Sequence, residues 1–167
     1  MPDDLYDTDI LAWSKAQADR LRRVAAGERV NDLDWAHVIE EVEDVGKSQL
    51  AAVTSLIAQA LQHALKIAAW PDHVAVPHWE AEIAGFMGQI KRRFEPGMQQ
   101  HVDPAALYAE ALEQVRQLRM QGAEPRPLPD QVTFSTADFR GASAGVTPLL
   151  ERIRAAQGRP ADDRQAP

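Results

Sequence analysis

Two groups of polar side chains in this sequence have the types and the spacing to support chemistry. The first is His37, Glu40 and Asp44, which recur at steps of three and four residues and therefore share one face of a helix. Helical bundles hold metal ions with Glu-x-x-His pairs, and this group has the reverse order. No second pair accompanies it, and its face points away from the apolar positions of the same stretch. We interpret the three candidate metal ligands as part of a solvent-exposed acidic face.

The second group comprises His63, Lys66 and Glu82. His63 and Lys66 are neighbours on one helix face, and a following helix that folds back would bring Glu82 close to them. In one interpretation they form a polar pocket that binds a small anion or a metal, with His63 as acid or base, Lys66 holding an anion, and hydrolysis as a possible activity. In the other, the contacts are structural: His63 donates to a carboxylate or a carbonyl, and Lys66 pairs with Glu82.

What the sequence lacks excludes several classes of function. It contains no cysteine, which excludes disulfides, thiol catalysis and cysteine-bound metals and is typical of a reducing cytoplasm. It also has no nucleophile elbow, no phosphate-binding glycine loop, no HExxH motif and no dinucleotide fingerprint. We therefore expect no cofactor.

Charge and hydropathy restrict the partners. The net charge of −7 opposes binding to nucleic acid or to an anionic membrane. No run approaches the roughly 20 apolar residues that a membrane-spanning helix needs, and the acidic N-terminus does not resemble a signal peptide. We expect a soluble cytoplasmic protein that binds neither nucleic acid nor membranes.

Hydrophobic periodicity predicts the helices that position these groups. Apolar residues recur at three- and four-residue steps over 5–26, 33–70, 78–94 and 103–121. The second stretch is unusually long and ends before Pro71, and Gly46 is its weakest point, where a kink could form. Asp103 followed by Pro104 is a strong helix start. The predicted fold class is all-α, an up-and-down bundle of four main helices with a very long second helix.

The first half of the long helix carries an apolar stripe. Its members are Trp35, Val38, Ile39, Val42 and Val45. We expect this stripe to face the core and the first helix to run antiparallel to it, because the connection is short. Glu43, at the edge of the stripe, should pair with Arg20. The four tryptophans, Trp13, Trp35, Trp70 and Trp79, are expected in the bundle core.

Beyond residue 121 the sequence becomes rich in proline and glycine. We predict an extended strap, held against the bundle by Val132, Phe134 and Phe139, and a short fifth helix over 149–157. Residues 158–167 read as a disordered tail. Residues 1–157 are therefore predicted to form one domain, with a core at 5–121 and the strap and short helix at 122–157.

Four segments together are similar to a known family. They are LYDTDILAWSKAQADRLRR, LDWAHVIEEVEDVGKSQL, QHALKIAAWP and the helix that begins at Trp79 and ends IKRRF. The combination resembles a bacterial family known as domain of unknown function number twenty-nine, over roughly residues 5–120, and its usual histidine-x-x-lysine is matched by His63 and Lys66. The resemblance implies an all-helical bundle without an assigned activity.

The expected function follows from these exclusions and from the excess length of the second helix. We expect a non-enzymatic helical module that binds another protein, or a second copy of itself, through surface that the long helix leaves uncovered. The alternative is the polar pocket of His63, Lys66 and Glu82.

Overall fold

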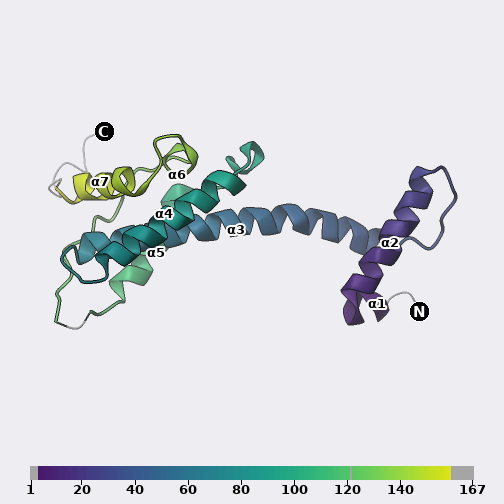
Figure 1. Ribbon diagram of the computed structural model, residues 1–167, viewed down its shortest axis with the longest axis horizontal. Coiled ribbons are helices and arrows are strands. Elements are labelled where there is room, and N and C mark those ends of the chain that lie inside the picture. Colours follow the sequence, from purple (N-terminus) through teal and green to yellow (C-terminus); the bar gives the residue numbers. More distant parts are fainter. Residues whose placement is uncertain (1–3, 121, 159–167) are drawn as a thin grey trace. The chain divides into compact units, whose positions relative to one another are not determined.

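The computed structural model describes residues 4–120 and 122–158. Within them the chain is helical, with one short 3-10 turn, η1, at Pro96–Met98 (Figure 1). The α-helices are α1 Asp4–Thr8, α2 Ile10–Ala25, α3 Trp35–Ala69, α4 Val76–Arg93, α5 Pro104–Arg116, α6 Ala137–Arg140 and α7 Val146–Gln157. No β-strand occurs in this part of the chain, so the predicted all-α class is confirmed.

The chain divides into two compact units, residues 1–48 and 49–167. Helix α3 contributes its first turns to the first unit and the rest to the second. Its helical assignment continues through Gly46, the glycine at which a kink was predicted. The prediction of one domain over 1–157 stays a prediction, and the predicted tail from 159 onwards lies outside the described residues.

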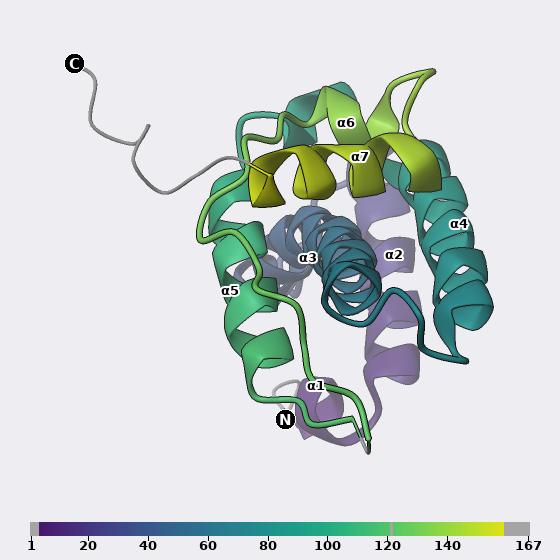
Figure 2. The same ribbon diagram turned by 90° about the vertical axis from the view of Figure 1, so that its left-hand side faces the viewer.

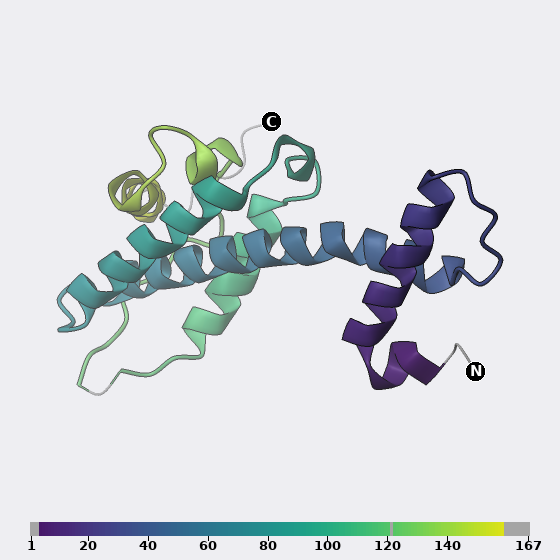
Figure 3. The ribbon, with the colours of Figure 1, turned by 45° about the vertical axis from the view of Figure 1, so that its right-hand side comes forward.

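In the first unit the predicted helix 5–26 is interrupted. The break is at Asp9, whose side chain accepts a hydrogen bond from the backbone N–H of Ala12 and so caps the start of α2. This cap creates two helices, α1 and α2, which pack against each other (Figure 3).

Helix α2 crosses the first turns of α3 and does not run antiparallel beside them (Figures 1 and 3). Trp13 and Gln17, the buried residues of α2, both bind Asp34 just before α3 begins. The indole Nε1 of Trp13 donates to the Asp34 carboxylate at 3.1 Å, and the Gln17 side-chain oxygen accepts from the Asp34 backbone N–H at 3.0 Å. These bonds place the start of α3 beside the first half of α2 instead of beside its end.

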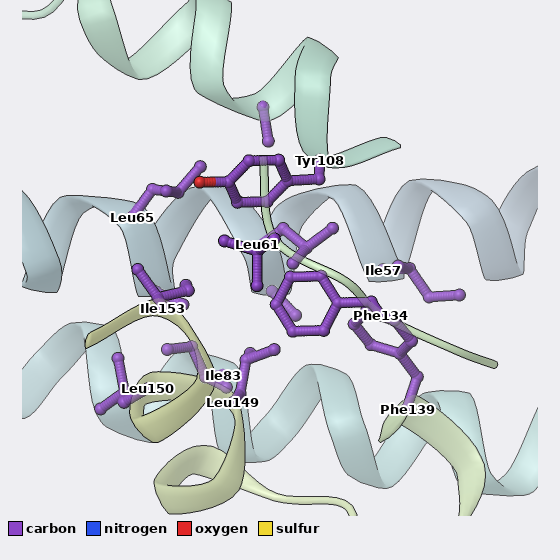
Figure 4. Packing of buried hydrophobic residues seen from close by; sticks show 14 of the residues in the cluster. Ile57, Leu61, Leu65, Ile83, Tyr108, Phe134, Phe139, Leu149, Leu150 and Ile153 are labelled. Atoms are coloured by element: carbon purple, nitrogen blue, oxygen red, sulfur yellow. The ribbon is translucent and has the colours of Figure 1, made fainter. Parts of the chain in front are cut away.

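In the second unit, α3 passes between α4 and α5 and α7 lies across them (Figure 2). The side chains that fill this core come from all four helices, from the strap and from α6 (Figure 4). Ile57, Leu61 and Leu65 of α3 are fully buried at its centre. Because one helix supplies the middle of the core, every other element of this unit is positioned against α3.

The strap and α7 pack against the helices of the second unit through the apolar residues that were predicted to hold them there. Val132, Phe134 and Phe139 of the strap are buried, as are Leu149, Leu150 and Ile153 of α7. Asp103 caps α5 by accepting from the backbone N–H groups of Ala105 and Ala106, and α5 ends at Arg116, earlier than the predicted residue 121. The short α6 was not predicted.

By length and composition alone, α3 is long and apolar enough to cross a membrane. No such segment was expected from the sequence, because charged and polar residues interrupt every apolar run. In the second unit the apolar side chains of α3 are core residues, and the central helix of a water-soluble domain meets the same criterion of length and composition.

Candidate functional site

The structure brings His63 and Glu82 together in the second unit. The His63 Nε2 atom lies 2.8 Å from a carboxylate oxygen of Glu82, and its Nδ1 atom lies 2.9 Å from the backbone carbonyl oxygen of Gln59. The imidazole also contacts the ring of Phe86 edge-on, and its side chain is only 13 % exposed. Both ring nitrogens therefore have partners, one a carboxylate and one a carbonyl.

Lys66, the third member of the predicted pocket, takes no part in this pairing. Within the described residues it forms no ion pair, and the expected Lys66–Glu82 pair is absent. Instead, the exposed His78 approaches the same Glu82 oxygen at 3.4 Å. The arrangement can transfer a proton between His63 and Glu82, but it presents no cation beside them to hold an anion.

Two hollows of the second unit are formed by other residues. One of about 460 Å³ is formed by Trp70, His73 and Val74 together with the strap at 122–126, and another of about 290 Å³ lies between Trp70, Val115 and the strap at 125–128. His63, Lys66 and Glu82 line neither of them.

A second polar cluster, around His37, lies in the first unit. The His37 Nδ1 atom is 2.6 Å from an oxygen of Asp34, the same oxygen that receives the Trp13 indole. The ring of Tyr6 stacks on the imidazole with 3.8 Å between ring centroids, and its hydroxyl donates to Glu41 at 2.8 Å. Side chains from α1, α2 and α3 thus meet at one polar cluster inside this unit.

These contacts shift three pKa values in the directions that their geometry requires. The hydrogen bond to Asp34 raises the pKa of His37 above its ordinary 6.5, and the hydrogen bond from His37 lowers the pKa of Asp34 below its ordinary 3.8. The hydrogen bond to Glu41, followed by burial, raises the pKa of Tyr6 to about 12. At neutral pH Tyr6 is therefore a donor, and Asp34 is an anion.

The predicted metal candidates do not form a centre. In residues 4–120 and 122–158 no three His, Asp or Glu side chains lie in an arrangement that could hold a metal ion. Glu40 and Asp44 are exposed, with Asp44 bound to Lys47 at 2.9 Å. His37 was predicted to lie on a solvent-exposed acidic face. In the structure it turns instead towards Tyr6 and Asp34.

The predicted ion pair between Glu43 and Arg20 is wrong. Arg20 binds Asp32 at 2.8 Å, whereas Glu43 lies 3.5 Å from Lys47, one turn further along α3. Arg20 turns to the loop after α2 because Asp32 is close to it there, and Glu43 has a cation on its own helix.

Four of the five members of the apolar stripe at the start of α3 are exposed and Val38 is half-buried, which contradicts the sequence prediction that the stripe faces the core. The exposed fractions are 54 % for Trp35, 54 % for Ile39, 69 % for Val42 and 65 % for Val45. We refer to these four residues as the α3 stripe. The face that packs inside the first unit is the polar one, with His37 and Glu41. It packs there because Tyr6 of α1 contacts both of these residues and Trp13 of α2 binds Asp34 beside them. Of the four tryptophans, Trp35 is accordingly the exception to the predicted burial.

The roles of Tyr6, Gln17 and Asp34 were not predicted from the sequence. The one available signal was the spacing of Trp13 and Gln17 on one face of α2, which marks the buried side of that helix. Their partner after the loop could not be deduced, since a nine-residue connection lets the chain return to any part of α2.

Comparisons with known proteins give a family and a fold. A solved structure, an α-helical protein of unknown function from Rhodospirillum rubrum, is similar with a TM-score of 0.68 and 24 % sequence identity, covering 89 % of this chain and 96 % of that one. At this identity the likeness shows the fold alone. No curated protein matches. The model of a family described as "Domain of unknown function DUF29" matches residues 5–140, about 20 residues further than the resemblance seen in the sequence. The chain therefore belongs to the family described as domain of unknown function DUF29.

Proposed function

We propose that this protein is a non-enzymatic helical module that binds another protein through the α3 stripe. The observation that carries the proposal is the exposure of four large apolar side chains, Trp35, Ile39, Val42 and Val45, on consecutive turns of one helix. Scattered exposed apolar residues are normal, whereas a contiguous group is typical of an interaction surface.

The free energy gained by burying apolar surface supports the proposal of a protein-binding stripe. Burial of apolar surface stabilises a complex by about 25 cal/mol per Å², and tryptophan is enriched among the residues that dominate binding energies. The period of the stripe is that of an amphipathic helix whose apolar face meets a partner. A bacterial cytoplasm, which suits a chain without cysteine, is the compartment we propose for this interaction.

A site-directed crosslinker tests the proposal. A photoreactive phenylalanine analogue placed at Val42 should capture a protein in cells, and the same analogue at Val74 should not. Val74 is the matched control, since it is 89 % exposed and belongs to the second unit.

The captured protein is then identified, purified and titrated with the wild-type chain and with Val42→Asp. We expect the substitution to weaken binding by about tenfold or more, because it places a charge in a desolvated contact. Equal affinity of the wild-type and Val42→Asp proteins, or capture at Val74 as efficient as at Val42, would reject the proposal.

A second candidate function is the binding of a small anion or a metal at His63, Lys66 and Glu82. It is favoured by the close approach of His63 and His78 to one carboxylate oxygen, whereas Lys66 forms no ion pair within the described residues. Thermal unfolding with zinc, manganese or inorganic phosphate tests it. An upward shift of the melting temperature that His63→Ala abolishes would support this candidate, and an unchanged melting temperature would dismiss it.

A further inference from the structure

The connection between α3 and α4, residues 70–75, consists of tight turns organised by His73. The backbone N–H of His73 donates to the carbonyl oxygen of Trp70 at 3.1 Å, and its own carbonyl oxygen accepts from the N–H of Val76 at 3.0 Å. The side chain adds a third bond, because the imidazole Nδ1 atom accepts from the backbone N–H of Ala75 at 3.1 Å. One residue therefore shapes the entry into α4, which begins at Val76.

The bond from Ala75 requires a neutral imidazole. An Nδ1 atom accepts a hydrogen bond only when it carries no proton, so the proton of the neutral ring must sit on Nε2. Backbone N–H groups at a helix start are usually bound by Ser, Thr, Asp or Asn, whose side-chain oxygens still accept in mild acid. Histidine changes its charge between about pH 5 and pH 8. The bond that holds this loop is therefore sensitive to acid.

Protonation of His73 acts on the backbone of the loop more than on the position of the ring. The imidazole stacks on the indole of Trp79, with 5.1 Å between ring centroids and 12° between planes, and an indole face attracts a cation. A protonated Nδ1 would face the N–H of Ala75 as a second donor, with no acceptor between them. The adjacent Val74 is 89 % exposed, so the backbone can move there without uncovering buried apolar surface.

The elements around His73 carry charges of both signs. Their charged and titratable side chains are Lys66 at the end of α3, Asp72 of the loop, His78 and Glu80 at the start of α4, and Glu124 and Arg126 of the strap. Asp72 and Arg126 bind each other at 3.2 Å, and His78 approaches Glu82. Because opposite charges share this region, the direct effect of protonation on the loop is the loss of the Ala75 bond.

We propose that His73 is a pH switch for the connection between α3 and α4. Neutral His73 holds the loop in the conformation of the structure, and protonation breaks the bond to Ala75 and loosens the loop. The loop also forms one wall of the hollow of about 460 Å³ between Trp70, His73, Val74 and the strap, so the hollow opens with it. The switch belongs to the second unit and does not depend on binding through the α3 stripe.

NMR of the full chain with isotope-labelled histidine tests the switch. Above the titration midpoint of His73, we expect the tautomer that carries its proton on Nε2, and an Ala75 amide that is protected from exchange with solvent. Below the midpoint the protection of that amide, corrected for the intrinsic exchange rate, should fall about five- to tenfold, because one hydrogen bond is lost. The amide of the buried Ile83 in the middle of α4 is the internal reference and should keep its protection.

Two variants separate the titration of His73 from the fold of the loop. His73→Asn keeps a side-chain acceptor two residues before Ala75, which asparagine uses in turns of this kind. It should protect the Ala75 amide equally at about pH 8 and about pH 5. His73→Ala removes the acceptor and should leave the amide unprotected at both values. His78→Asn, a change at an exposed histidine of α4, should leave the pH dependence of wild type intact.

Three results would overturn the proposed switch. A proton on Nδ1 of neutral His73 would exclude the bond from Ala75. Constant protection of the Ala75 amide while the imidazole titrates would show that the bond does not hold the loop. A loss of protection in His73→Asn at the same pH as in wild type would assign the pH dependence to another group.

Discussion

Asp34 ties together the start of α3 and the side chains of the first unit. Its carboxylate accepts from the indole of Trp13 and from the imidazole of His37, and its backbone N–H donates to Gln17. The chain thus uses one carboxylate to join α2 to α3, and Tyr6 covers the resulting Asp–His pair. The result is a polar interior on the side of α3 opposite to the one that sequence periodicity favours.

We predict that His37 titrates above its ordinary pKa of 6.5 and returns towards that value in Asp34→Asn, because the bond to Asp34 is the main cause of the shift. NMR titration of the imidazole protons measures both midpoints. A midpoint at or below 6.5 in the wild-type protein would show that the pair does not form.

The same pair sets a pH window for stability. The raised pKa of His37 contributes stability that is fully present below pH 6.5 and is lost as the pH rises through the folded-state value. The lowered pKa of Asp34 contributes stability that is present above pH 3.8 and is lost as the pH falls through its folded-state value. Between pH 3.8 and pH 6.5, the contributions of Asp34 and His37 to stability are both fully present.

In the second unit, His63→Ala should lower the free energy of unfolding by about 2–3 kcal/mol, since it removes the bonds to Glu82 and Gln59 and the contact with Phe86. Urea denaturation followed by circular dichroism measures the loss. His78→Ala is the control, with an expected change within about 0.5 kcal/mol because that side chain is mostly exposed. Equal losses in the two variants would contradict a structural role specific to His63.

Local signals in the sequence were sufficient for several residues. The fold-back of the third predicted helix brings Glu82 to His63, and Asp103 before Pro104 marks the cap of α5. His37 was placed in solvent because apolar residues on the same helix were assumed to face inward. A residue pattern shows that a helix has two unlike faces, and only the neighbouring elements decide which face is covered.

At the scale of elements, α3 combines two different environments. From Val53 onwards its apolar positions are buried in the core of the second unit, and there the sequence predicted the packing correctly. Over its first turns the same periodicity continues, but the described neighbours pack on the polar side. The sequence therefore predicted the existence and extent of this helix, with bounds close to those observed, and not the environment of its first turns.

Gly46→Ala should stabilise the protein by about 0.5–1 kcal/mol, because alanine favours the helix and its methyl group meets nothing in the chain. Thermal or urea unfolding checks this. Gly85→Ala in α4, equally open, should stabilise the protein by a similar amount. A destabilised Gly46→Ala protein would mean that another part of the chain already packs there.

At the scale of the whole molecule, the two units differ greatly in the size of their cores. In the described part of the chain, the buried residues of the first unit are Trp13, Gln17 and Leu33, whereas the second unit holds an extensive apolar cluster. Since burial is the main stabilising contribution, resistance to local opening should differ in the same way.

Amide hydrogen exchange should therefore be faster in α2 and in the first turns of α3 than in the segment from Ile57 to Leu65. Mass spectrometry of peptic fragments under native conditions measures this difference. Uniform protection along the chain would contradict the inequality of the two cores.

The central claim is that the α3 stripe is open in the isolated protein and covered by a partner in the cell. Because the chain has no cysteine, Val42→Cys provides a single thiol on the stripe, and Val74→Cys provides the reference thiol. The measurement is the rate of maleimide labelling of each variant, first as purified protein at low concentration and then in intact cells. We predict equal rates for the two purified variants and slower labelling of Val42→Cys than of Val74→Cys in cells. Equal rates in cells, or protection of Val42→Cys already in the purified protein, would contradict the claim.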